Sequence, residues 1–305
     1  MHDLVRLYAD EHGRARSTPD QRDTARTRLF THYQDTTEAA GTHLETVPGP
    51  RAPGFPDRAA ALRWLDAERT NLTAAISAMT PGYPVATTSL AFPLIAYLEY
   101  RRYFSDLIML TTTASAICRE MDDRYGESLA LNHLGLALRE VRRFEEAIDA
   151  HTQDLAICQQ LDDRDREGTA LNNLACALQK VRRFEEAIDA LNQSLAICRQ
   201  LDDRHGEGTE LHNLGAIFRD VRQFEEAIDA HNQAAAIFRE LGDRHAEGLT
   251  INGLGFLLHE TRRLDEAIDA YTQAAGIFRE LGDRHSEVQA LTWRANAEHE
   301  RRRGG

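Results

Sequence analysis

The residues best placed to do chemistry in this chain are acids, arginines and histidines that recur together. An Asp-Arg pair is followed, three residues after the arginine, by a glutamate, and this group occurs five times. His205, His245 and His285 directly follow the arginine in three of the groups. Neighbouring carboxylates and imidazoles are the usual partners in general acid–base catalysis. The groups are Asp123-Arg124 with Glu127, Asp163-Arg164 with Glu167, Asp203-Arg204 with Glu207, Asp243-Arg244 with Glu247, and Asp283-Arg284 with Glu287.

Fivefold repetition favours a structural role for these groups over a catalytic one. An active site is needed once, whereas a helix start must be capped in every repeated unit. Aspartate caps helix N-termini, and an arginine and a glutamate three residues apart on a helix form a local ion pair. No Ser-His-Asp, Cys-His or paired-carboxylate arrangement stands apart from the repeat. We therefore expect no catalytic residue and no enzymatic activity.

The cysteines and the single lysine indicate neither a metal site nor a nucleotide site. Cys118, Cys158, Cys176 and Cys198 form no C-x-x-C arrangement, so we expect no zinc site and no redox pair. Lys180 follows a glutamine, so the Gly-Lys pair of a phosphate-binding P-loop is absent. We expect no cofactor and no metal. Three of the cysteines are 40 residues apart, and we expect buried core thiols at that position, with a redox role as the alternative.

Composition and charge exclude several classes of partner. The chain has 305 residues, of which 42% are hydrophobic, enough for two globular domains or one elongated repeat protein. Its 36 basic and 49 acidic residues give a net charge of −13, which argues against direct binding to nucleic acid or to an anionic membrane. The N-terminal residues lack the apolar region of a signal peptide, and we expect a cytoplasmic protein without a membrane anchor.

A repeat with a period of 40 residues organises most of the chain. The string FEEAIDA begins at Phe144, Phe184 and Phe224, and returns as LDEAIDA at Leu264. Within one unit, apolar residues at three- and four-residue spacing mark two helices, joined by a short turn around Arg142. A short connection makes the two helices antiparallel neighbours. Each unit is therefore predicted to be a helical hairpin, and hairpins must stack to bury their apolar faces.

The repeated unit resembles the tetratricopeptide pattern. Leu131-x-x-Leu134-Gly135-x-x-Leu138 matches its first helix, and Ala147 and His151 follow in its second. The usual tryptophan and terminal proline are missing, and the period exceeds the usual 34 residues, as in arrays of the Pins/LGN and kinesin-light-chain type. The resemblance implies an all-α, right-handed α-solenoid, with an N-terminal helical segment. We expect a degenerate repeat at 86–121, regular repeats at 127–161, 167–201, 207–241 and 247–281, and a capping helix at 287–302, which together form an array over 86–305.

The first 85 residues are predicted to form a helical linker region. Pro19 to Ala40 reads as one helix with Ala25, Leu29, Tyr33 and Ala40 facing inward, and a proline-rich loop over 41–56 follows. Asp57 is positioned to cap a further helix. That helix has Leu62, Leu65, Leu72, Ile76 and Met79 on one face.

Two phrases in this region resemble parts of NB-ARC ATPases. The first is Met1 to Ala9, MHDLVRLYA, which is similar to the segment that ends their nucleotide-binding and winged-helix module. The second is Trp64 to Leu72, WLDAERTNL. It is similar to a phrase between that module and the repeat array in actinobacterial STAND ATPases and AfsR-type regulators. The resemblance implies that residues 1–85 follow a module absent from this chain. It also implies that His2 approaches nucleotide phosphates only in a longer parent protein.

The resemblance to tetratricopeptide arrays places the first helices on a concave groove that binds an extended peptide or a protein. Amides recur beside the apolar stripe of these helices, and an amide offers both a donor and an acceptor to a peptide backbone. The alternative is that the amides bond neighbouring helices. The candidates are Asn132, Asn172 and Asn252 at one position, and Asn173 and Asn213, with His133, at the next.

A cationic strip is predicted one turn further along the first helices. It comprises Arg139, Lys180, Arg219 and His259, and acidic neighbours such as Glu140, Asp220 and Glu260 make a self-neutralised face the alternative.

These patterns predict a non-catalytic scaffold that binds a protein or peptide as the sensor part of a STAND-type signalling ATPase or transcriptional regulator. The alternative is a free-standing tetratricopeptide adaptor that tethers two proteins without nucleotide control. Self-association is left open as a further kind of contact.

Overall fold

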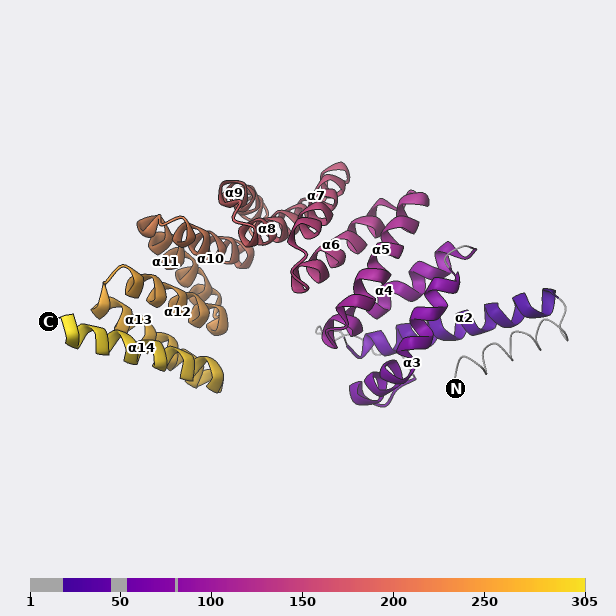
Figure 1. The fold of residues 1–305 in the computed structure, drawn as a ribbon, viewed down its shortest axis with the longest axis horizontal. Coiled ribbons are helices and arrows are strands. Elements are labelled where there is room, and N and C mark those ends of the chain that lie inside the picture. Colours follow the sequence, from indigo (N-terminus) through magenta and orange to yellow (C-terminus); the bar gives the residue numbers. More distant parts are fainter. Residues whose placement is uncertain (1–18, 45–53, 80–81, 305) are drawn as a thin grey trace. The chain divides into compact units, whose positions relative to one another are not determined.

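The computed structural model describes residues 19–44, 54–79 and 82–304, and all regular structure within them is α-helical (Figure 1). The described residues form thirteen helices and no strand, which confirms the all-α prediction. No helix among them is both long and apolar enough to cross a bilayer. His2 and the rest of the phrase Met1 to Ala9 lie outside the described residues.

The chain divides into two compact units, residues 1–141 and 142–305, and each is described by itself. The helices of the first unit are α2 (Pro19–Thr42), α3 (Arg58–Met79), α4 (Pro84–Tyr100), α5 (Phe104–Glu120) and α6 (Arg124–Glu140). Those of the second are α7 (Phe144–Gln160), α8 (Arg164–Lys180), α9 (Phe184–Gln200), α10 (Arg204–Asp220), α11 (Phe224–Leu241), α12 (Arg244–Glu260), α13 (Leu264–Leu281) and α14 (Arg284–Gly304).

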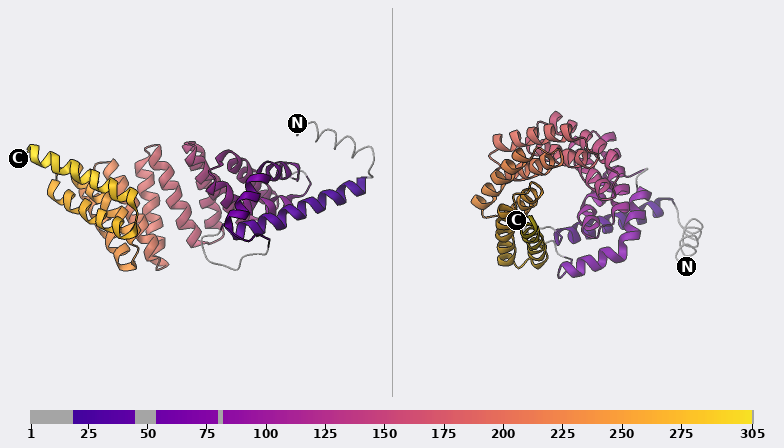
Figure 2. Two further views of the ribbon diagram at one scale, coloured as in Figure 1. Left: turned by 90° about the horizontal axis from the view of Figure 1, so that it is seen from below. Right: turned by 60° about the vertical axis from the view of Figure 1, so that its left-hand side comes forward.

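The second unit is a stack of antiparallel helices that pack in chain order (Figure 2). Besides these sequential contacts, α10 touches α8 and α12, and α12 touches α14. The first helices of successive hairpins therefore form one continuous row. We call the surface of α8, α10, α12 and α14 in this row the first-helix face.

The turns between helices repeat one backbone conformation, which keeps the helices in step. Helices from α5 to α14 begin every 20 residues. Arg182, Asp202 and Arg222 occupy left-handed turn positions with φ of 64°, 55° and 64°, and Gly242 takes that position after α11 with φ of 71°. Glycine adopts this region without the steric penalty that a side chain carries, whereas aspartate tolerates it better than most residues.

The first helices of the second unit start on a side-chain cap, as the sequence predicts. Asp163 accepts a hydrogen bond from the backbone N–H of Arg166 at 3.2 Å, and Asp243 accepts one from that of Ala246 at 3.0 Å. The cap satisfies a backbone donor that has no partner within the helix. The second helices α9, α11 and α13 have no side-chain cap.

The glutamates of the first four Asp-Arg-x-x-Glu groups are buried and are held by residues of two helices, whereas Glu287 is half-buried and accepts from Arg279. Glu247 is fully buried and accepts from Arg239 of α11 at 2.8 Å, and from Arg244 of its own helix. Glu207 is held in the same way by Arg199, at 2.8 Å, and Arg204. The interaction fastens the end of one hairpin to the start of the next. The predicted ion pair is confirmed, and it also links two helices that the sequence reading treated separately.

We predict that Glu247→Ala lowers the free energy of unfolding by about 2 kcal/mol, because charged hydrogen bonds to two arginines are lost while the arginines stay partly solvated. Glu226→Ala, on the exposed face of α11, is the control and should stay within about 0.5 kcal/mol of wild type. Urea denaturation followed by circular dichroism measures both. Equal midpoints for the two variants would contradict a stabilising role for the buried carboxylate.

Three of the four cysteines are core residues, as expected. Cys118, Cys158 and Cys198 are buried, Cys176 is half-buried, and all four are free thiols. Burial, followed by nearby carboxylates, raises the pKa of the Cys118 and Cys198 thiols to about 11. These two side chains are therefore neutral packing residues rather than reactive thiolates.

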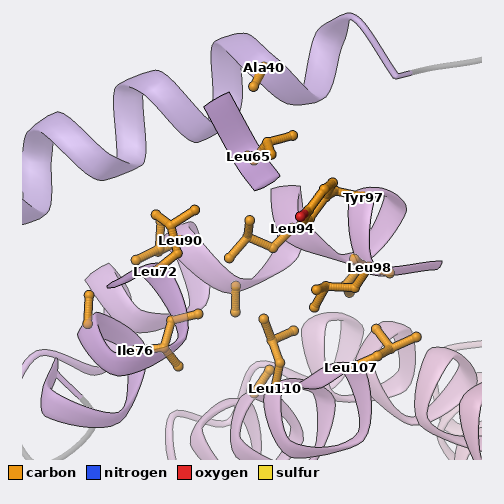
Figure 3. Packing of buried hydrophobic residues seen from close by; sticks show 14 of the residues in the cluster. Ala40, Leu65, Leu72, Ile76, Leu90, Leu94, Tyr97, Leu98, Leu107 and Leu110 are labelled. Atoms are coloured by element: carbon orange, nitrogen blue, oxygen red, sulfur yellow. The ribbon is translucent and has the colours of Figure 1, made fainter. Parts of the chain in front are cut away.

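The core of the first unit is formed by α3, α4 and α5 (Figure 3). The backbone N–H of Ala60 donates to Asp57 at 2.7 Å, which confirms the predicted cap of α3. The predicted apolar face of α3 is also confirmed, since Leu62, Leu65, Leu72, Ile76 and Met79 are all buried.

The predicted inward face of α2 is partly wrong. Leu29 is 47% exposed and Ala25 is also exposed, whereas Phe30, Thr37 and Ala40 are buried. The helix packs on α3 and α4 through a stripe that includes Phe30, one residue after the predicted Leu29. A shift of one residue turns a helix by about 100°, enough to exchange Leu29 for Phe30.

The phrase Trp64 to Leu72 attaches α3 to the helices that follow. Asp66 accepts hydrogen bonds from the Tyr97 hydroxyl of α4 at 2.9 Å and from Nε of Arg101, the residue that follows α4, at 3.0 Å. Arg69 pairs with Asp106 of α5 and lies over the ring of Tyr103, 4.4 Å from its centre. The charged residues of the phrase therefore tie α3 to the first hairpin, while its leucines enter the core.

We predict that Asp66→Ala lowers the free energy of unfolding of the first unit by about 1–2 kcal/mol, because the buried Tyr97 loses the acceptor of its hydroxyl. Arg63→Ala, on the exposed face of α3, should have little effect. Hydrogen exchange of the α3 and α4 amides localises the change. Protection that is unchanged in Asp66→Ala would show that this contact does not hold the helices together.

Candidate ligand-binding face

The second unit brings two of the predicted amides together on the first-helix face. Asn213 Nδ2 of α10 donates to Asn172 Oδ1 of α8 at 2.8 Å. This pair therefore bonds neighbouring helices, as the alternative reading expected. Each amide keeps hydrogen-bonding capacity beyond this one bond, since an amide has two N–H donors and an oxygen that accepts twice.

The other predicted amides lie at the same two positions of the 40-residue repeat. Asn252 of α12 is half-buried, and its Oδ1 is a buried acceptor without a hydrogen-bond partner within the described residues. Asn173 of α8 is half-buried beside Asn172. Asn132 belongs to α6 and therefore to the first unit, where the adjacent His133 lies 2.7 Å from Glu99 of α4. A buried unpaired oxygen is costly, so Asn252 is a candidate for contact with a ligand or water.

The predicted cationic strip is largely neutralised by its own neighbours, and one of its members is misplaced. Lys180 shares its repeat position with Asp220, whereas Gln179 occupies the position of Arg219 and donates to Asp220 at 2.9 Å. Arg219 also donates to Asp220, at 2.9 Å, and lies over the Phe256 ring. His259 Nε2 lies 3.3 Å from a carboxylate oxygen of Glu300.

In the first unit, Arg139 lines a cavity of about 330 Å³ together with Glu99, Arg102, Phe104, Leu136 and Glu140. The carboxylate of Glu140 lies 3.1 Å from Arg102.

Two cavities occupy equivalent places in successive repeats of the second unit. The first, of about 170 Å³, lies between α8 and α10 with α9 as its floor, and Asn172, Ser194, Cys198 and Glu210 line it. The second, of about 150 Å³, lies between α10 and α12 with α11 as its floor. His212, Phe238, Leu249 and Thr250 line this second cavity.

A buried glutamate that the sequence reading did not single out lines the first cavity. Glu210 is 4% exposed, and its Oε1 lies 2.9 Å from Ser194 Oγ, which also lies 3.0 Å from the carbonyl oxygen of Gly168. A hydroxyl has one hydrogen to donate, so when Ser194 donates to the carbonyl of Gly168 it can only accept from Glu210, and this arrangement uses a protonated Glu210. Burial raises the pKa of Glu210 to about 7, in agreement with a protonated carboxyl.

The signal for Glu210 is present in the repeat itself. The same position holds Ala130, Ala170, Thr250 and Ala290 in the other units. A single acid among small residues breaks the pattern of the core, and a comparison of repeats position by position would have found it.

We predict that Glu210 makes the protein less stable as the pH rises from about 5 to 8. Its folded-state pKa is raised, so the folded protein holds a proton that the unfolded chain releases above its ordinary pKa of about 4.5. The contribution is present at low pH and lost through pH 7, and it amounts to roughly 3 kcal/mol.

Comparison with Glu210→Gln isolates this contribution, since other titrating groups are common to both proteins. The difference in unfolding free energy, wild type minus variant, should fall with rising pH when urea denaturation is measured at intervals between pH 5 and 8. Glu240→Gln, an exposed carboxylate on α11, should follow the wild-type profile. Parallel profiles for wild type and Glu210→Gln would show that Glu210 is ionised in the folded state.

Two histidines near this face pack against each other, His231 buried and His212 half-buried. His212 and His231 stack edge to face with their ring centres 5.3 Å apart, and burial lowers the pKa of His231 to about 3. A Cβ on Gly215 would lie 2.9 Å from Nε2 of His231, so the absence of a side chain at Gly215 lets the His231 ring pack directly against α10.

A larger cavity of about 380 Å³ lies at the far end of α12 and α14. Phe256 and Trp293 meet there at right angles with ring centres 5.5 Å apart. Arg262 and His259 both approach Glu300 at its rim.

No cluster of three or more metal-ligating side chains occurs among the residues that the structure describes. This face can offer hydrogen bonds and apolar contacts to a ligand. It also has the carboxyl group of Glu210, whose pKa is about 7.

Comparison with known proteins identifies the repeat. A family model described as tetratricopeptide repeat matches residues 116–200 and 209–301, more than half of the chain. The search of curated proteins gave no match.

Solved structures share the fold at low sequence identity. BtubC (BKLC) from P. vanneervenii is 19% identical with a TM-score of 0.62, over 73% of this chain and 92% of that protein. A putative kinesin light chain from Podosopora anserina is 18% identical with a TM-score of 0.56, over 66% and 98%. A Rap protein complexed with Competence and Sporulation Factor is 14% identical with a TM-score of 0.61, over 91% and 86%. These likenesses concern the fold and confirm the kinesin-light-chain-like character of the array.

Proposed function

Since the chain belongs to the tetratricopeptide repeat family, we propose that it is a non-catalytic scaffold that binds an extended peptide or a segment of a protein on its first-helix face. The Asn172–Asn213 bridge carries this proposal, because it sets amides of two successive helices side by side on one surface. Amides so placed can pair with both the N–H and C=O groups of a main chain, whatever its side chains. The Rap protein complexed with Competence and Sporulation Factor supports this use of the fold.

The neighbouring groups on this face complement the amides. Asn252 offers an unpaired buried oxygen, and the two equivalent cavities offer places for side chains of the ligand. Arg219 and His259 are engaged with acids, whereas Lys180, one residue beyond the position of Arg219 in its repeat, is exposed and is the group best placed to meet an acid of the partner. Asn132 and Arg139 are proposed to take the same role on α6 of the first unit.

The experiment is a selection of binding peptides from a random display library, followed by measurement of their affinities for purified variants. Asn172→Ala with Asn213→Ala should weaken binding by about tenfold or more, while stability changes by about 1–2 kcal/mol, as for one lost hydrogen bond. The matched control is Asn192→Ala with Asn232→Ala, which removes two exposed amides from the second helices α9 and α11.

Equal losses in both double variants, or none in either, would count against the first-helix face as the binding surface. Asn173→Ala with Asn213→Ala should behave like the first pair, and a collapse of its melting temperature would instead mark those amides as structural.

The larger context of this scaffold is proposed to be the sensor part of a STAND-type ATPase or transcriptional regulator. The phrase Trp64 to Leu72 supports this, because its Asp66 and Arg69 form a polar joint between α3 and the first hairpin. These contacts are suited to transmitting a conformational change from the array through α3 to a module that precedes it. The nucleotide would be bound by that module, with His2 at its phosphates.

A free-standing adaptor is the alternative, and nucleotide dependence separates the two. In a polypeptide that carries the ATPase module before residue 1, the sensor proposal expects peptide binding to differ between ATP and ADP, and Asp66→Ala to abolish that difference without weakening binding itself. Equal binding in both nucleotides would favour the adaptor.

A further inference from the structure

The cavity between α8 and α10 differs in chemistry from its counterpart one repeat later. We call it the acidic socket, and Asp165, Thr169, Ser194, Asp203, Thr209 and Glu210 are among its lining residues. Its entrance is open at the first-helix face, where Asp165 and Thr169 are exposed. The socket lies beside the amide bridge, since Asn172 also lines it.

Four substitutions between equivalent positions account for the difference. Where the later cavity has Phe238, Ala246, Leu249 and Thr250, the acidic socket has Cys198, Gly206, Thr209 and Glu210. A cysteine in place of phenylalanine and a glycine in place of alanine open space. Polar side chains in place of leucine and threonine make the space hydrophilic. The repeat thus presents one polar and one apolar pocket on the same face.

The carboxyl at the bottom of the acidic socket is incompletely satisfied. Glu210 Oε1 is bonded to Ser194, but Oε2 is buried without a hydrogen-bond partner among the described residues. An unpaired buried oxygen destabilises the folded protein, and a donor placed in the socket would offset that cost.

The groups that face Glu210 favour a cation as that donor. Asp165 of α8 and Asp203 at the start of α10 are acids, Cys198 of α9 is a neutral thiol, and Ser194 and Thr209 are hydroxyls. None of these lining groups is basic. A multivalent metal is disfavoured, since no cluster of metal ligands occurs within the described residues. The volume of about 170 Å³ suits an unbranched side chain.

We infer that the acidic socket binds the ammonium group of a lysine side chain carried by the polypeptide on the first-helix face. The inference rests on the proposed function, which supplies that polypeptide. An ammonium is a compact group with three donors, enough for Glu210 Oε2 and the surrounding hydroxyls, whereas arginine's flat fork requires a pair of coplanar acceptors. The adjacent cavity, with Phe238 and Leu249, receives an apolar side chain of the same ligand.

Binding of the ammonium is linked to the proton on Glu210. The cation favours the ionised carboxylate, so the proton leaves as the ammonium enters. Affinity therefore rises as the pH passes through about 7, where Glu210 titrates in the free protein.

The test compares two short peptides by NMR titration of the whole chain: acetyl-Ala-Ala-Lys-Ala-Ala-amide and the same peptide with norleucine, which has the apolar stem without the charge. The lysine peptide should bind at least about tenfold more tightly and shift the amide signals of Ser194, Thr209 and Glu210. Glu210→Gln should remove the preference, and the exposed Glu240→Gln should keep it.

Equal affinities of the two peptides for wild type would overturn the inference, as would a preference that survives in Glu210→Gln or disappears equally in Glu240→Gln. The last result would assign the preference to the overall charge of −13. An affinity for the lysine peptide that does not rise between pH 6 and 8 would also overturn it.

The two proposals fail in distinguishable ways. If library-selected peptides bind and respond to Asn172→Ala with Asn213→Ala, but show no lysine preference, the acidic socket is wrong and the binding face stands. If no peptide responds to the amide variants, the binding face itself is wrong.

Discussion

A buried carboxylate near the start of a hairpin, bonded to donors of its own helix and of the preceding helix, is the interaction on which the array depends. Hydrophobic burial drives helices together, but it has no direction and does not fix which turn follows which. Glu207 and Glu247 supply that direction, because each one accepts from the last turn of the preceding hairpin and from the first turn of its own. The carboxylates are buried while the arginines remain partly in water, so no charge is left both buried and alone.

Most of the fold can be predicted from the sequence because the same local signals for helix starts and buried faces recur in every 40-residue unit. Aspartate caps and apolar stripes recur every 40 residues, and the period alone predicts where they lie in the array. The N-terminal helix α2 has no second copy to compare, and there the inward face was placed one residue away from Phe30. Periodicity fixes the spacing of a stripe more firmly than its starting point.

The candidate site was less accessible to sequence reasoning, for two physical reasons. Whether an amide meets a ligand or the next helix depends on distances between helices, and the Asn172–Asn213 bond appears only when these are known. Glu210 was passed over because a glutamate on a helix ordinarily lies in solvent, and only packing against Ser194 shows it to be buried. Lys180 does not share the repeat position of the other predicted cations, because Gln179 stands 40 residues before Arg219.

The tetratricopeptide fold gives each unit the same backbone architecture. Specificity for a ligand must therefore lie at the positions where the side chains of the units differ. Cys198 and Phe238 illustrate this, because one backbone position holds either a small thiol or a full ring, and the surface beside it changes from a polar hollow to an apolar one. Substitutions of side chains can therefore change what the surface binds without new loops or new helices.

One junction in the second unit lacks the second arginine. Gln159 stands where Arg199 and Arg239 stand in later repeats, so Glu167 receives an uncharged amide at 3.1 Å in addition to Arg164. A neutral donor compensates a carboxylate less well than a guanidinium does. The carboxylate at the seam between α7 and α8 is thus held by one arginine, where those at the seams before α10 and α12 are held by two, and it contributes less to keeping its seam closed.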